Sequence, residues 1–97
     1  MDGDLVQELL NQMKRFIDGT FDPLEFSYDF PVNLINANEG LKSKNKQLYE
    51  LLNEDMPEIC ANYEPDDVAR QGEPDLLDEE QFRRKVKEVY EKANRFI

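Results

Sequence analysis

Apolar residues recur at steps of three and four along most of the chain, a spacing that places side chains on one face of a helix. Between residues 5 and 17 this stripe consists of Leu5, Val6, Leu9, Leu10, Met13, Phe16 and Ile17. Gly19 follows the stripe and suits the left-handed residue that closes many helices. We therefore predict a first amphipathic helix over residues 5–17.

A second helix is predicted to begin after Asp22, which precedes Pro23 and is followed three positions later by Glu25. This order is typical of an N-cap with a proline in the first turn and a reciprocal capping box. Pro31 lies inside the pattern, and we expect a kink or a break there because proline removes one helical hydrogen bond and clashes with the preceding turn. The residues expected to end the segment are Asn36, Asn38 and Gly40.

The third stripe is the most regular one and starts from about residue 43. Its members are Leu48, Leu51, Leu52, Met56, Ile59, Cys60 and Tyr63. Pro57 lies within it, so either the helix bends there or a short second helix begins with Pro57 in its first turn. The following residues, 64–77, include Pro65, Gly72 and Pro74 and few apolar side chains, which predicts an exposed loop.

The last helix has a complete start signal, with Asp78 as N-cap, Gln81 as its capping-box partner and Leu77 placed to pack on Phe82. Its apolar stripe comprises Phe82, Val86, Val89, Tyr90, Ala93 and either Phe96 or Ile97. Four helical patterns without strand-like alternation predict an all-α fold. We expect residues 1–97 to form a single domain, a small antiparallel four-helix bundle with kinked second and third helices.

Charge is distributed very unevenly. The 97 residues include 22 acids, 12 Lys and Arg and no histidine, for a formal charge of −10. Residues 54–80 contain eleven of these acids and one base, Arg70, so the rest of the chain is neutral in sum. Affinity for a phosphate backbone or an anionic membrane requires Lys and Arg. We therefore expect a positively charged partner and no direct contact with nucleic acid or membrane.

Patterns for catalysis and metal binding are weak. The missing histidine removes the commonest general base and zinc ligand. The acids between residues 64 and 75 lack the spacing of an EF-hand, and prolines break the loop that carries them. No glycine-rich phosphate loop and no nucleophile with a partner base accompanies them. We predict a protein that is not an enzyme and has no cofactor or metal, a metal-dependent carboxylate enzyme being the most distant alternative.

Cys60 is the one cysteine, so no internal disulfide can form, which is usual in a reducing compartment. Its place on an apolar stripe beside Glu58 and Glu64 favours a buried, unreactive thiol. The first four residues are acidic where a signal peptide is basic, and the longest apolar run has three residues, from Ile59 to Ala61. We expect a cytoplasmic protein.

Two short motifs are familiar. The pentapeptide Tyr63-Glu64-Pro65-Asp66-Asp67, followed by an acidic loop and a helix ending in Val89-Tyr90-Glu91-Lys92, resembles the colicin D immunity protein family. The segment Asp22-Pro23-Leu24-Glu25-Phe26-Ser27 is similar to the second helix of that family, where a Glu-Phe-Ser triplet recurs. The similarity covers roughly residues 16–96, and it departs from the family at Ala61 and Asn62, which stand in place of a further acid and base. Related immunity proteins serve colicins, pyocins and contact-dependent growth inhibition systems.

The resemblance implies a helical bundle that binds the C-terminal tRNA-cleaving domain of a toxin, with acids occupying the basic catalytic cleft in place of substrate phosphates. Glu64 and Asp66 match the family motif, and Asp67 is their neighbour. Tyr63 is either an apolar anchor for the partner or the end of the third core stripe. The predicted toxin-binding residues are Tyr63, Glu64, Asp66 and Asp67, with Glu73, Asp75, Asp78 and Glu79 steering from the rim. A general mimic of nucleic acid, of the anti-restriction type, is the alternative, and it would bind several unrelated DNA-processing enzymes.

Overall fold

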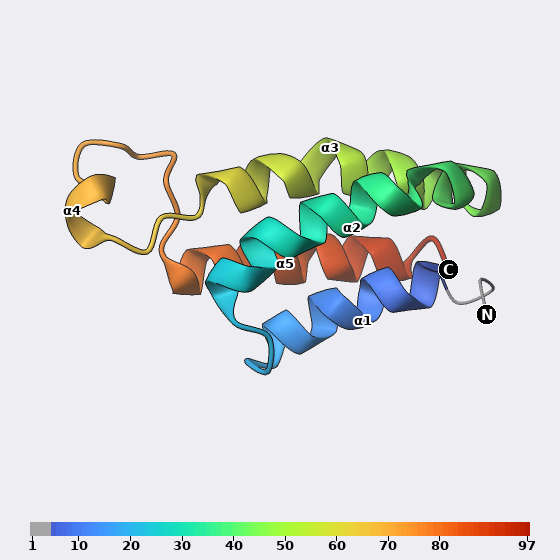
Figure 1. The fold of residues 1–97 in the computed structure, drawn as a ribbon, viewed down its shortest axis with the longest axis horizontal. Helices are drawn as coiled ribbons and strands as arrows, with labels where there is room; N and C mark the ends of the chain where they lie inside the picture. Colours follow the sequence, from blue (N-terminus) through green and yellow to red (C-terminus); the bar gives the residue numbers. More distant parts are fainter. Residues whose placement is uncertain (1–4) are drawn as a thin grey trace.

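The computed structural model describes residues 5–97, which form five helices (Figure 1). The helices are α1 (Leu5–Ile17), α2 (Pro23–Lys44), α3 (Lys46–Asn62), α4 (Asp67–Arg70) and α5 (Glu79–Asn94). No β-strand occurs in this range, so the predicted all-α class is confirmed. The acidic stretch 1–4, used above as an argument against a signal peptide, lies outside the described residues.

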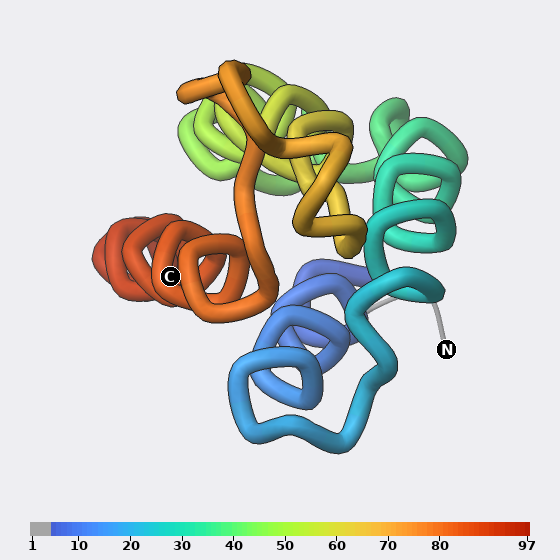
Figure 2. The backbone as a smooth tube through the Cα atoms, turned by 90° about the vertical axis from the view of Figure 1, so that its left-hand side faces the viewer, coloured from blue at the N-terminus to red at the C-terminus, as the bar shows by residue number. Residues whose placement is uncertain are grey.

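The four longer helices form a helical bundle. α1 packs against α2 and α5, and α3 packs against the same two helices from the other side. Figure 2 looks along the bundle and shows these helices around a common centre. The chain reverses direction between one long helix and the next (Figure 1). The molecule measures 43 × 24 × 23 Å, with the helices along its longest dimension.

The predicted stripes supply the core. Every fully buried residue between positions 5 and 97 is apolar, and no buried polar or charged side chain occurs there. The centre is aromatic, since the ring of Phe16 lies 4.4 Å from that of Phe26 and 4.6 Å from that of Phe82, measured between ring centroids. Phe30 stacks on Phe26 at 5.1 Å. Three helices thus meet in one aromatic cluster.

The junction between α1 and α2 follows the sequence signals. Gly19 has φ +87°, the left-handed conformation that glycine adopts without strain. Asp22 caps α2, because its carboxylate accepts a hydrogen bond from the Glu25 N–H at 3.1 Å. The predicted N-cap at Asp22 is therefore confirmed, whereas the other half of the predicted capping box, a hydrogen bond from the Asp22 N–H to the Glu25 side chain, does not form.

The predicted end of the second helix is wrong. α2 continues through Pro31 without a break and reaches Lys44, beyond the expected terminators. A side chain at Gly40 would place its Cβ 2.8 Å from Leu5 Cδ2, so this glycine leaves room for the Leu5 side chain of α1 and does not end the helix. Asn38 exchanges two hydrogen bonds with Asn53 of α3, at 3.0 and 2.8 Å, and so satisfies its amide across the helix interface.

α3 begins at Lys46, a few residues later than predicted, because Asn45 is its N-cap. The Asn45 side chain accepts from the Leu48 N–H at 3.1 Å and donates to the Phe96 carbonyl at 2.7 Å, which also holds the end of the chain. α3 is continuous through Pro57, so a separate helix starting at that proline does not form.

The capping box of α5 is confirmed. The Asp78 carboxylate accepts from the Gln81 N–H at 2.8 Å, and the Gln81 side chain accepts from the Asp78 N–H at 3.0 Å. The last stripe ends at Ala93, since Ile97 is 67 % exposed and Phe96 also faces solvent. The prediction that one of these two residues joins the core is wrong.

Candidate protein-binding site

The acidic loop between α3 and α5 is closed at its base by a two-residue parallel bridge. Tyr63 pairs with Leu77, with hydrogen bonds from the Glu64 N–H to the Leu77 carbonyl at 2.9 Å and from the Leu77 N–H to the Asn62 carbonyl at 2.8 Å. Residues 64–76 project from this bridge at one end of the molecule, and none of them is fully buried (Figure 1). The loop is thus attached to the bundle at a single fixed point.

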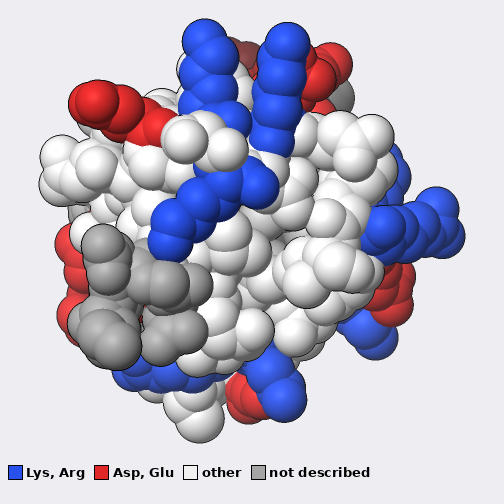
Figure 3. Space-filling view, turned by 90° about the vertical axis from the view of Figure 1, so that its right-hand side faces the viewer, with Lys and Arg blue, Asp and Glu red and all other residues white. Residues whose placement is uncertain are grey.

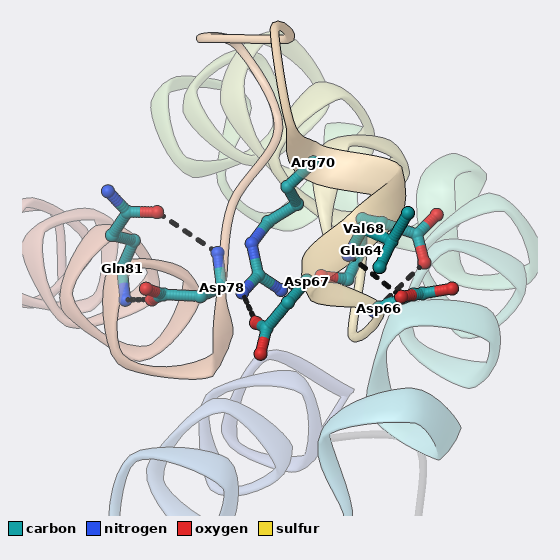
Figure 4. A network of polar contacts seen from close by, with 7 residues as sticks. All are labelled: Glu64, Asp66, Asp67, Val68, Arg70, Asp78 and Gln81. Atoms are coloured by element: carbon teal, nitrogen blue, oxygen red, sulfur yellow. Dashed lines mark hydrogen bonds and ion pairs between the residues drawn. The ribbon is translucent and has the colours of Figure 1, made fainter.

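The tip of this loop is the short helix α4, which the sequence analysis did not anticipate. Asp66 caps it, accepting from the Val68 N–H at 2.9 Å. Arg70 organises the rest, since its guanidinium pairs with the Asp67 carboxylate and donates to the Glu64 carbonyl (Figure 4). The Arg70 side chain is 20 % exposed and that of Asp67 is 88 % exposed, so the base is covered while the acid still faces water.

The three acids predicted to fill a partner's cleft are therefore brought together and held by internal contacts. The Glu64 carboxylate accepts from the Asp66 N–H at 3.2 Å, so each of Glu64, Asp66 and Asp67 has a partner within the tip. Gly72 has φ +77° and turns the chain back toward α5. A carboxylate in such a contact keeps unused lone pairs, so these acids are still able to accept from a partner.

The four predicted rim acids separate into two kinds. Asp78 caps α5, and Glu79 pairs with Arg83 at 3.0 Å, so both are engaged in helix α5. Glu73 and Asp75 are exposed and have no such side-chain contact. Asp75 lines a groove, described below, that the tip acids do not line.

Tyr63 belongs to the core side of the loop. Its ring stacks on Phe82, with 4.7 Å between centroids, and the residue is half-buried. Burial, together with the charges of Glu79 and Asp22, raises the pKa of Tyr63 above its ordinary value of 10.0. Of the two roles left open for Tyr63, the structure shows the packing one.

A groove of about 640 Å³ lies between α3, α5 and the loop. Its apolar surface comes from Ile59, Pro74, Leu77 and Val89. Two bases, Lys85 and Lys92, also line it. Its carboxylates are Glu54, Asp55, Glu58, Asp75 and Glu88.

Sequence reasoning missed this groove as a site. Glu54, Asp55 and Glu58 were counted in the acidic segment only, and Glu88 lies outside that segment. The available signal was the three- and four-residue spacing of the α3 acids, which places them on one helix face. Nothing in the sequence pattern indicated that α5 residues also line the groove, because this depends on how α3 and α5 pack.

Positive charge gathers at the other end of the molecule. The α2–α3 turn, which carries Lys42, Lys44 and Lys46, lies opposite α4 along the long axis (Figure 1). Figure 3 views that end directly and shows Lys and Arg side chains standing out from it. The protein is therefore acidic at the loop end and carries bases at the opposite end.

Three further features of the described residues are the state of Cys60, the grouping of possible metal ligands and the apolar character of the helices. Burial raises the pKa of the Cys60 thiol to about 12, so the thiol is protonated at neutral pH. Within residues 5–97 no group of three or more potential ligands is arranged to hold a metal ion. In the same range, no helix combines the length and apolar character needed to cross a membrane.

Comparisons with protein-family models, curated protein sequences and solved structures find no match to this chain. The resemblance to colicin D immunity proteins therefore rests on the short motifs described above.

Proposed function

We propose that the protein is an immunity protein that neutralises the C-terminal nuclease domain of a bacterial toxin, a tRNA-cleaving one by the resemblance. In this proposal the acidic loop enters the basic active-site cleft, and Glu64, Asp66 and Asp67 replace RNA phosphates. The observation that carries the proposal is the concentration of acids on one braced loop at one end of the bundle. The motifs shared with the colicin D immunity family agree with it.

Bracing of the loop supports an inhibitory role. Binding costs free energy when flexible loops and side chains must be ordered, and contacts already present in the free protein reduce that cost. Here the bridge at Tyr63 and Leu77 fixes the base, and Arg70 fixes the tip (Figure 4). The acids are thus presented in a defined arrangement before any partner arrives.

Charge polarity supports rapid association. A basic cleft attracts an acidic surface over a distance, and steered association reaches about 10⁸ to 10⁹ M⁻¹s⁻¹ at low salt. Bases at the far end of a 43 Å molecule also favour the orientation in which the loop leads. An inhibitor acting in the cytoplasm benefits from this speed, because it must reach the toxin before RNA does.

The fold proposed with this function is an antiparallel four-helix bundle whose second and third helices bend at Pro31 and Pro57. The bundle serves as the scaffold for the loop. Catalysis by the protein itself has no part in the mechanism.

The central test is the double variant Glu64→Gln, Asp66→Asn. Asparagine caps a helix about as well as aspartate, so α4 is retained while two charges are removed. As the binding partner we take the basic C-terminal domain of the secreted protein that this proposal expects the adjacent reading frame to encode. We expect the dissociation constant to rise about 30-fold, as for loss of about 2 kcal/mol from buried charged pairs, and protection of cells from the toxin to weaken.

The control is Asp29→Asn, Glu39→Gln, which removes two exposed charges from α2 without touching the loop. It should bind within about threefold of the wild type, since exposed charges far from a contact contribute little. Unchanged binding and protection by the loop variant would refute this placement of the acids. Absence of any binding to the neighbouring gene product by the wild type would refute the function.

A further inference from the structure

We infer that the groove between α3 and α5 is a second docking site, which receives an amphipathic segment rich in Lys and Arg from a protein partner. The inference rests on the proposed function for the identity of that partner, but it concerns a different surface. The groove residues Glu54, Glu58 and Glu88 lie on α3 and α5, whereas the acids assigned to the nuclease cleft lie on α4 and its flanks.

The groove acids differ from the tip acids in having no internal partner. Among residues 5–97, the ion pairs join Arg70 to Asp67, Arg83 to Glu79 and Arg84 to Glu80. None of the five groove carboxylates takes part in an ion pair or a side-chain hydrogen bond in that range. The three arginines in these ion pairs neutralise acids of the loop and α5, and the lining of the groove stays negative.

The concave shape of the groove strengthens its negative electrostatic potential. Five carboxylates and two ammonium groups surround it, so its lining carries an excess of three negative charges. A concave surface in the low-dielectric body of a protein focuses the electric field of the charges that line it. The mutual repulsion of the groove acids decreases when a cationic group enters, which favours occupancy by a base.

The apolar floor identifies the kind of base. Ile59, Leu77 and Val89 line the groove together with the acids, and a small inorganic cation gains nothing from contact with them. Lys and Arg side chains have aliphatic stems that pack on apolar surface while their charged ends reach carboxylates. The volume, about 640 Å³, lies within the range of about 300 to 1,000 Å³ typical of ligand pockets, and so suits several side chains of one segment.

The position of the groove connects it to the proposed function. Asp75 and Pro74 belong to the acidic loop and also line the groove, so the groove adjoins the loop. A nuclease domain that binds RNA carries basic segments beyond its catalytic residues. We assign the groove to one of these segments, which would add contact area outside the cleft.

The test compares three double variants with the same loss of charge. Glu58→Gln, Glu88→Gln changes the groove, Glu64→Gln, Asp66→Asn changes the tip, and Asp29→Asn, Glu39→Gln is the control on α2. Two probes are titrated by calorimetry: the basic domain encoded by the adjacent gene, and a short amphipathic helical peptide of leucine and lysine. The helical circular dichroism of each variant establishes that it is folded.

We expect the groove variant to bind both probes about tenfold more weakly than the wild type, and the control to change by less than about threefold. The tip variant should lose affinity for the nuclease domain and keep its affinity for the peptide. If the groove and control variants weaken peptide binding equally, attraction is nonspecific and the inference is overturned. It is also overturned if the groove variant binds the nuclease domain normally while the tip variant does not, an outcome that leaves the proposed function intact.

Discussion

The Cys60 thiol lies on the inner face of α3, where 4 % of the residue is exposed. Burial disfavours the thiolate and raises the pKa of the thiol from 9.0 to about 12. Its placement on an apolar stripe with acidic neighbours predicted an unreactive thiol, and the structure agrees. A group with so different a pKa in the folded and unfolded chains makes stability depend on pH.

Between about pH 9 and about pH 12 the folded protein holds the thiol proton and the unfolded chain releases it. The contribution of the thiol to the free energy of unfolding is therefore complete below about pH 9 and decreases as pH rises toward 12. At about pH 10 the loss should be on the order of 1 kcal/mol. Urea unfolding of the wild type and of Cys60→Ala at about pH 8 and about pH 10 measures it, because the other titrating groups are common to both proteins. Equal pH dependence in the two proteins would contradict the prediction.

Pro31 and Pro57 lie inside α2 and α3, and both helices continue through the proline. Pro57 has no N–H to donate to the Asn53 carbonyl four residues earlier, yet α3 continues through it. Leu52, Met56 and Cys60 are buried on both sides of this position. Tertiary packing thus holds the helix together where local preference alone would end it.

Replacing Pro57 with alanine should raise the free energy of unfolding by about 2 kcal/mol. Proline costs about 3 kcal/mol in a helix interior, and the greater freedom of the unfolded alanine chain offsets up to about 1 kcal/mol of the gain. Pro57 is exposed, so the substitution leaves no cavity. Urea denaturation measures the change, with Pro65→Ala in the loop as a control that should destabilise slightly. A Pro57→Ala protein no more stable than the wild type would show that the helix pays no penalty at this proline.

Helix boundaries were predictable where the signal was local. The bounds of α1, the cap at Asp22 and the capping box at Asp78 depend on residues adjacent in sequence, and all three predictions are confirmed. The prediction for the end of α2 failed because it depends on residues that are distant in the chain. Gly40 leaves room for Leu5, and Asn38 forms hydrogen bonds with Asn53.

The candidate site, like the helix boundaries, could be predicted from the sequence only in part. Its acids could be found from composition, because eleven of them fall within residues 54–80. Their partners could not, since nothing in the pattern assigns Arg70 to Asp67 or leaves Glu58 without a base. Chain order grouped the acids together, whereas three-dimensional packing separates a braced tip from an unpaired groove.

The molecule as a whole is a bundle with one projecting loop, and the two parts are energetically distinct. Among residues 5–97, all fully buried side chains lie on the four long helices or at Leu77, and none lies in residues 64–76. The free energy of folding is therefore expected to come from the bundle. The loop is expected to contribute mainly to binding.

Replacing residues 65–76 with a short Gly-Ser linker tests this division. The bridge residues Tyr63 and Leu77 remain in this variant. Shortening a loop reduces the entropic cost of closing it only slightly. We expect the helical circular dichroism to be retained and the thermal midpoint to stay within about 5 °C of the wild type, which corresponds to about 1 kcal/mol in a domain of this size. Binding to the basic domain of the adjacent gene product should be lost. A variant that fails to fold would show that the loop also stabilises the bundle.

The bridge between Tyr63 and Leu77 also has a consequence for how such a protein diverges. Because the chain leaves and re-enters the bundle at one hydrogen-bonded point, substitutions in residues 64–76 alter the acidic surface without disturbing any core contact. Four of the five groove acids, in contrast, sit on α3 and α5 among residues that also hold the bundle together: Glu54, Asp55, Glu58 and Glu88. New partner specificity is therefore most accessible to mutation at the loop, while the groove is constrained to change slowly.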